Sequence, residues 1–449
     1  MIFFNNNASL IKAIKSGDAE KCSKLILKGT NPNIHDKNGQ AILILALELE
    51  NADIAKILVK AGADVNVVNK ENEPALSLAI LMNDLELFHS MLDSGANPNT
   101  PSGKSRNFVY YKYDKNKRRE SIKEEVPDKF YTPLLIAAGN GNLQMVRQLL
   151  SFDVDINIQT EAGFTPLILA AQHGYFDIVK LLLERGAKTD LHVIDGTTAL
   201  LTSIENQFTN IIRFLLDNKA DPNDELKSGT TALHLAAQFG LLEIVKLLLE
   251  HDAKIKPGGD KNSMPLHIAI EKGFTEIVKV LLENGADINA RRDDDETPLI
   301  RAVSMENNTI VNLLLEKGAD IHCKNNKGGN ALHLAADSGM TEAIKLLIKK
   351  GASIDVIAGN GCSAFHLAVQ GNHYDAATVL ADAGANINLP DPEGQVPLLF
   401  AILDENVRMV ELLIRNKAKT IAVTKSGASI IAAARQVGNQ KILNMISQV

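Results

Sequence analysis

Four histidines and one cysteine are the residues whose types could support acid–base, thiol or metal chemistry. His234, His267, His333 and His366 are spaced by 33 residues or a multiple of 33, and Cys362 precedes His366 by four positions. An i, i+4 pair can share a catalytic proton or a metal ion, but no third ligand is recognisable near Cys362. The regular spacing instead indicates structural hydrogen-bonding groups. We therefore predict no catalytic residue, no metal site and no cofactor.

An acidic run, Asp293-Asp294-Asp295-Glu296, is the second cluster that could do chemistry. A calcium loop needs alternating oxygen ligands and a glycine at the sharp turn, and this run has neither. We interpret it as the solvated tip of a hairpin. The alternative is an acidic patch that faces a binding partner.

The element that positions these residues is an internal repeat of 33 residues. One apolar column recurs along the chain, with a single long step of 58 residues: Leu10, Leu43, Leu76, Leu134, Leu167, Leu200, Leu233, Leu266, Leu299, Leu332, Phe365, Leu398 and Ile431. Three residues after each column position stands an alanine, except for Ser203, and fifteen residues after it stands Leu, Met or Ile. Three columns in one register predict thirteen repeats.

The residues within one repeat explain its local structure. Thr165 can cap a helix that begins at Pro166, and Gly186 can end the second helix in a left-handed turn. Thr231-Ala232-Leu233-His234-Leu235-Ala236-Ala237 and its counterparts at 264–269 and 330–336 resemble the ankyrin repeat. The resemblance implies an all-α repeat solenoid, in which each repeat is a β-hairpin followed by two antiparallel helices.

Departures from the columns predict where the stack is weaker. The glycine that ends the second helix is replaced at Asp153, Lys219, Asp252 and Lys417. A left-handed residue other than glycine costs roughly 1 kcal/mol. The repeat around Leu200 combines Lys219 with Ser203 and Gln207, so we expect it to be the softest interior repeat.

The long step in the column marks an insertion, which gives three segments. We predict repeats 1–3 with an N-terminal cap over residues 1–99, an insertion over 100–130, and repeats 4–13 with a C-terminal cap over 131–449. The insertion is rich in Lys and Arg and holds Tyr110, Tyr111 and Tyr113. One interpretation is a solvated extension; the other is a contact arm with tyrosine anchors.

Composition bounds the partners and the compartment. The net charge of −7 disfavours nucleic acid, and no window of 18 apolar residues occurs that could insert into a membrane. Three distant cysteines without a CxxC pair indicate a reducing compartment, so we expect a cytoplasmic, elongated monomer.

Proteins that this chain resembles generally bind partners through hairpin tips and the inner ends of the first helices. We therefore predict a non-catalytic interaction scaffold, with these partner-binding residues: Phe164, His173, Gln238, Phe239, Glu271, Lys272, Asp293, Asp294, Glu296 and Met305, with Tyr110, Tyr111 and Tyr113 of the insertion. The rival hypothesis is an enzyme regulator or weak enzyme that uses the insertion. A third, suggested by Ile-, Asn- and Lys-rich usage, is a secreted bacterial effector that captures a host protein in the host cytosol.

Overall fold

A computed structural model describes residues 2–103, 110–113, 119–122, 130–259, 262–421, 423–425, 427 and 429–447. These residues divide into two compact units, unit 1 (residues 1–227) and unit 2 (residues 228–449). Helices dominate both units, and the described chain forms thirteen helix pairs, as the repeat columns predict. None of the described helices combines the length and the apolar character that a membrane crossing requires.

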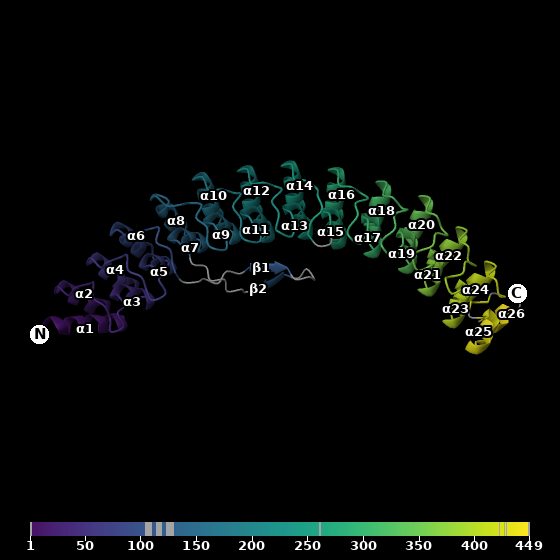
Figure 1. Cartoon of the computed structure of the whole chain (residues 1–449), viewed down its shortest axis with the longest axis horizontal. Helices are drawn as coiled ribbons and strands as arrows, with labels where there is room; N and C mark the ends of the chain where they lie inside the picture. Colours follow the sequence, from purple (N-terminus) through teal and green to yellow (C-terminus); the bar gives the residue numbers. More distant parts are fainter. Residues whose placement is uncertain are drawn as a thin grey trace. The chain divides into compact units, whose positions relative to one another are not determined.

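Unit 1 holds the first six helix pairs and the one hairpin of regular strands in the described chain. Its first helices contact one another in sequence order, and so do its second helices, so the pairs stack in two rows (Figure 1). The elements are α1 (Ile2–Lys15), α2 (Ala19–Leu27), α3 (Ile42–Glu48), α4 (Ala52–Lys60), α5 (Ala75–Leu81), α6 (Leu85–Asp93), β1 (Tyr110–Tyr113), β2 (Arg119–Ile122), α7 (Pro133–Gly139), α8 (Leu143–Leu149), α9 (Pro166–Gln172), α10 (Phe176–Glu184), α11 (Ala199–Glu205) and α12 (Thr209–Asp217).

Unit 2 repeats the same arrangement with seven pairs, again in two rows of mutually contacting helices (Figure 1). Its elements are α13 (Ala232–Gln238), α14 (Leu242–Glu250), α15 (Pro265–Lys272), α16 (Thr275–Glu283), α17 (Pro298–Ser304), α18 (Asn308–Glu316), α19 (Ala331–Asp337), α20 (Thr341–Lys349), α21 (Ala364–Gln370), α22 (Tyr374–Asp382), α23 (Pro397–Leu403), α24 (Val407–Arg415), α25 (Ile430–Val437) and α26 (Gln440–Ser447).

Each first helix begins where its sequence predicts. The Thr165 hydroxyl accepts a hydrogen bond from the backbone N–H of Ile168 at 3.1 Å, and Pro166 occupies the first turn of α9. The alanine column is at most 1% exposed in every repeat, and Ser203 in the same column is 0% exposed. Small residues therefore lie where neighbouring helices approach most closely, which confirms the register of the repeat.

The last repeat departs from the column in one respect. Ile431 occupies the reference position, but it is 41% exposed, whereas its neighbour Ile430 is buried. The alanine three residues later, Ala434, is still fully buried. We attribute the exposure to the place of α25 at the end of the stack, where no further repeat within the described chain covers its outer side.

Left-handed backbone positions follow the expected slots. Lys219, Asp252 and Lys417 have φ angles of 67°, 64° and 63°, where most repeats use glycine to end the second helix. Gln207, which follows the first helix of its repeat, has a φ of 62°. Two of these residues, Gln207 and Lys219, belong to the repeat around Leu200, which is the last of unit 1. The backbone strain expected for that repeat is present.

An asparagine ladder joins the hairpins of neighbouring repeats. The Asn66 amide donates to the Gly95 carbonyl at 3.1 Å, and its oxygen accepts from the Asn97 N–H at 2.8 Å. The next rung crosses the insertion: the Asn99 amide donates to the Asp153 carbonyl at 2.8 Å. Repeats 3 and 4 are thus joined in the same way as repeats that are adjacent in sequence.

The insertion leaves and re-enters the stack at one point. The Ser102 N–H donates to the Tyr131 carbonyl at 2.8 Å, and both side chains are buried. Beyond this base, β1 pairs antiparallel with β2, with Tyr110 opposite Ile122 and Tyr113 opposite Arg119. The loop is therefore closed at its base by the same kind of bridge that closes the short hairpins of other repeats, such as His35 with Ala41.

Candidate partner-binding surfaces

Unit 2 carries a groove of about 650 Å³ between hairpin tips and first helices. Its lining is mostly polar and contains four carboxamides or hydroxyls for every apolar anchor at its floor, Leu334 and Leu367 being the largest of the latter. The lining residues are Asp294, Glu296, Ser304, Asn325, Asn326, Lys327, Gly329, His333, Leu334, Asp337, Ala358, Asn360 and Leu367.

The ratio in the second sentence above is too high and is corrected here: three asparagines and one serine line the groove, against two leucines and one alanine. The lining also holds three carboxylates, Asp294, Glu296 and Asp337, and one cation, Lys327. The groove is therefore polar and weakly acidic, with a small apolar floor.

The ends of the first helices present several of the predicted partner-binding residues side by side. Gln238 ends α13, Lys272 ends α15, and Phe239 and Met305 directly follow α13 and α17. Met305 is 41% exposed and Lys272 is exposed, whereas Gln238 and Phe239 are half-buried. Since α13, α15 and α17 are neighbours in one row, these side chains lie along one edge of unit 2. His173 has the equivalent position in unit 1 and is exposed.

Phe164 is a correction. We expected its ring at the surface, but it is only 4% exposed. Phe164 closes the hairpin before α9: its N–H donates to the Thr160 hydroxyl, and its carbonyl accepts from the Thr160 N–H, each at 3.0 Å. The same slot holds the buried residues Tyr131 and Cys362 in other repeats. A side chain in this slot packs inward and is not available as a surface anchor.

A buried ion network occupies part of the predicted acidic surface. Arg292, whose side chain is 2% exposed, lies 2.6 Å from the carboxylate of Glu271, and Arg301 lies 2.9 Å from the same carboxylate. Arg301 also pairs with Glu296 at 3.2 Å. Sequence reasoning missed both arginines and treated Glu271 and Glu296 as contact residues. Their side chains are 12% and 17% exposed, so they serve mainly the fold.

Asp293 and Asp294 differ within the acidic run. Asp293 is exposed, as a solvated hairpin tip requires, whereas the Asp294 side chain is 21% exposed and lies 4.0 Å from Arg292. The Asp294 carbonyl also accepts a hydrogen bond from the Asn326 N–H of the next hairpin at 3.3 Å. Only part of the run is therefore presented to solvent.

The histidine column is buried and hydrogen-bonded. In His234, Nδ1 accepts from the Thr231 N–H at 3.2 Å, and Nε2 is 2.9 Å from the Ser263 carbonyl of the next repeat. His333 repeats this pattern with Asn330 and Val356. Burial lowers the pKa of His333, and burial together with the charge of Arg292 lowers the pKa of His267 to about 4. Neutral, enclosed imidazoles of this kind connect repeats, as predicted.

The thiols are poor nucleophiles. Burial raises the pKa of Cys22 to about 11 and also raises the pKa of Cys362. His366 directs Nδ1 to Ser363, whose N–H lies 3.3 Å away. Within the described residues, no group of three or more His, Cys, Asp or Glu side chains is placed to hold a metal ion.

The tyrosines of the insertion are placed only in part. Tyr110, Tyr111 and Tyr113 lie on β1, but their side chains are outside the described residues. The contact-arm interpretation therefore stays a prediction.

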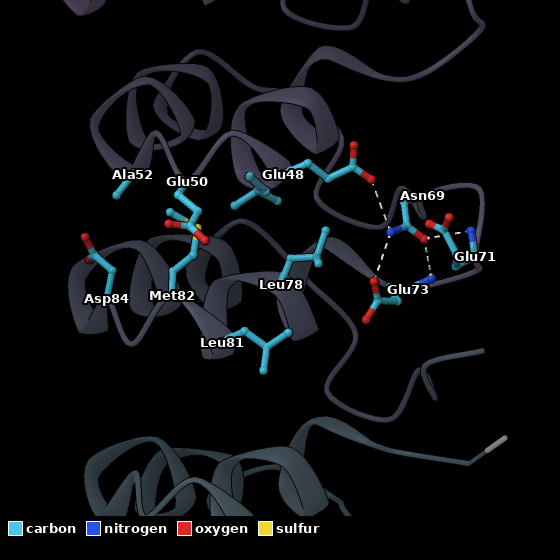
Figure 2. Close-up of a pocket in the computed structure, with 11 residues that line it drawn as sticks. Glu48, Glu50, Ala52, Asn69, Glu71, Glu73, Leu78, Leu81, Met82 and Asp84 are labelled. Carbon is cyan, nitrogen blue, oxygen red and sulfur yellow. Dashed lines mark hydrogen bonds between the residues drawn. The ribbon is translucent and has the colours of Figure 1, made fainter. Parts of the chain in front are cut away.

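Unit 1 carries a second groove, of about 600 Å³, which sequence reasoning did not find (Figure 2). Leu78, Leu81 and Met82 of the α5 segment lie in its middle, and acidic side chains lie toward its ends (Figure 2). The lining residues are Leu47, Glu48, Glu50, Ala52, Asn69, Glu71, Glu73, Leu78, Leu81, Met82 and Asp84. The signal in the sequence was an apolar pair, Leu81-Met82, in slots that other repeats fill with polar residues.

Comparison with known proteins agrees with this architecture. A family model described as ankyrin repeats (3 copies) matches residues 10–102, 107–195, 188–258, 255–325 and 318–391. Among solved structures, the chain is similar to the ankyrin repeat domain of Bcl-3, described as a unique member of the IkappaB protein family, with 25% sequence identity and a TM-score of 0.45. That match covers 49% of this chain and 100% of the Bcl-3 chain. No curated protein matches the sequence.

The family matches cover well over half of the chain, and the helix pairs described above follow the same 33-residue register. Ankyrin repeats generally mediate protein–protein interactions, and the family is generally non-catalytic. The chain belongs to the ankyrin-repeat family.

Proposed function

We propose that this chain is a non-catalytic scaffold that binds another protein through the edge of unit 2 formed by the ends of α13, α15 and α17. The observation that carries the proposal is Met305, an apolar side chain that is 41% exposed beside the polar groove. Ser304, its neighbour, lines that groove. An exposed apolar anchor bordered by hydrogen-bonding groups is the usual anatomy of a protein-binding surface.

The remaining residues of the edge support a protein partner. Phe239 is half-buried in the slot equivalent to Met305, and Lys272 in the repeat between them is exposed. Asn325, Asn326 and Asn360 offer amides that can pair with a partner's backbone. The proposal uses neither a cofactor nor a metal.

The test compares capture with stability. Phe239→Ala combined with Met305→Ala should weaken partner capture by about 2 kcal/mol or more, which is the size of an interface hot spot. Leu248→Ala is the matched core control, because Leu248 is fully buried and its truncation should cost about 2 to 5 kcal/mol of stability. Capture is measured by pull-down from a eukaryotic lysate with mass spectrometry, and stability by thermal unfolding.

Two outcomes would contradict the proposal. Unfolding of the surface variant as severe as that of Leu248→Ala would show that Phe239 and Met305 belong to the core. Unchanged capture with unchanged stability would move the binding surface elsewhere. The finer hypothesis of a bacterial effector acting in a host cytosol rests on composition and family analogy, and partners found only among host proteins would support it.

A further inference from the structure

The groove of unit 1 has an apolar middle. Leu78, Leu81 and Met82 stand at i, i+3 and i+4, a spacing that places three side chains on one face of a helix. Leu81 is 42% exposed, and Leu78 and Met82 are half-buried. In α19 of unit 2 the equivalent slots hold Leu334, Asp337 and Ser338, so the apolar face of α5 is not a general property of the repeat.

Acidic side chains flank this apolar face. At one end, the Asn69 amide donates to Glu48 at 3.3 Å and to Glu73 at 3.0 Å, and Glu71 lies beside them (Figure 2). At the other end, Glu50 lies next to Met82 (Figure 2). One amide thus holds two carboxylates together at the rim of an apolar surface.

Positive charge is missing from the lining. Among the described residues that line the groove, none is Lys or Arg. Asp84 is the one lining carboxylate with a printed ion pair, to Lys56 at 2.8 Å, and Lys56 does not line the groove. An exposed apolar face between acidic ends is complementary to an apolar side chain between basic ones.

We propose that the unit 1 groove binds a protein segment in which apolar side chains are flanked on both sides by Lys or Arg. The apolar side chains pack on Leu78, Leu81 and Met82, and the basic ones face Glu48 and Glu71 at one end and Glu50 at the other. This site is separate from the proposed edge of unit 2, so either one can fail while the other stands.

The experiment measures binding of a defined probe to the full chain. The probe is a fluorescein-labelled peptide, Lys-Arg-Leu-Leu-Arg-Lys, and binding is followed by fluorescence anisotropy. We expect saturable binding that weakens between about 50 mM and about 200 mM salt, because screening reduces the attraction between exposed charges. A peptide with serines in place of both leucines should bind at least about ten-fold more weakly.

The chain offers a matched control. Leu403 and Glu393 occupy the same repeat slots in unit 2 as Leu81 and Glu71 in unit 1, and all four residues are exposed. Leu81→Ser with Glu71→Lys should weaken binding at least about ten-fold, whereas Leu403→Ser with Glu393→Lys should change it less than about two-fold. Circular dichroism should show equal helix content in both variants.

Several results would overturn the proposal. These are the absence of saturable binding, or equal weakening by the two double variants. Binding that appears only after removal of residues 104–129 would assign the groove to the chain's own basic insertion. Dissociation of a self-associated chain by the peptide, seen by sedimentation, would assign it to a second copy. Loss of probe binding with retained capture through Met305 would leave the proposed function intact.

Discussion

The two units use the same repeat but fill one slot differently. In unit 2, the position after the reference column holds His234, His267, His333 and His366, all buried. In unit 1, the same slot holds Ile44, Ser77, Leu135, Ile168 and Leu201, also buried. The histidines connect repeats through hydrogen bonds, whereas the unit 1 residues contribute mainly apolar contacts. Identical architecture is therefore compatible with a different response to acid.

The ion network sharpens this difference most. Glu271→Ala in unit 2 should destabilise the chain by about 3 to 5 kcal/mol, because Arg292 would keep a buried charge without its closest partner. Glu71→Ala in unit 1 is the control, since Glu71 is exposed and the change should stay within about 0.5 kcal/mol. Chemical denaturation measures both. Equal effects would mean that the network contributes no more than surface charges.

Acid should destabilise unit 2 through His267. In the unfolded chain the imidazole titrates near 6.5, and in the folded chain near 4. As the pH falls from 6.5 to 4, the unfolded state binds a proton that the folded state does not, so up to about 3 kcal/mol of stability is lost. His267→Ile should remove much of this dependence, as followed by thermal unfolding from pH 7 to pH 5.

The converse substitution tests the same idea in unit 1. Ile168→His would restore Thr-Pro-Leu-His at 165–168 and should introduce acid sensitivity into unit 1. Hydrogen exchange in α9 and α10, measured on the full chain, would locate the effect. A chain whose pH dependence is unchanged by both substitutions would show that the histidines do not set it.

Asp224 in unit 1 should act in the opposite direction. Burial raises its pKa from 3.8 to about 6, so the folded state binds more protons than the unfolded state between these values. Stability contributed by this group rises as the pH falls from 6 toward 3.8. Asp224→Asn should therefore stabilise the chain at pH 7 by about 1 to 2 kcal/mol, after allowance for partial exposure. The gain should vanish near pH 4.

Lys219→Gly should give the smallest effect. Its φ of 67° favours glycine, so the substitution should stabilise the last repeat of unit 1 by up to about 1 kcal/mol. Lys417→Gly, at a φ of 63°, is the counterpart in unit 2. If neither variant shifts the melting temperature upward, the left-handed lysines are not a source of strain.

The repeat columns were enough to predict the fold, because each column is repeated in nearly every unit and the buried alanines and leucines follow it. The surface was harder to predict. Arg292 and Arg301 stand among acidic residues that sequence reasoning treats as solvated, and only the fold brings Glu271 to them from another repeat. Phe164 looked like a variable surface residue because its slot tolerates Gln40 and Thr197 as well as buried rings.

The bridge between Ser102 and Tyr131 makes the stack indifferent to what lies between them. The chain departs and returns across one hydrogen bond of 2.8 Å, and the asparagine rung from Asn99 to Asp153 joins the flanking repeats without the loop. Doubling the length of such a loop adds only about 0.6 kcal/mol of closure cost. This position is consequently a port at which natural variation, or a designer, can exchange one passenger sequence for another.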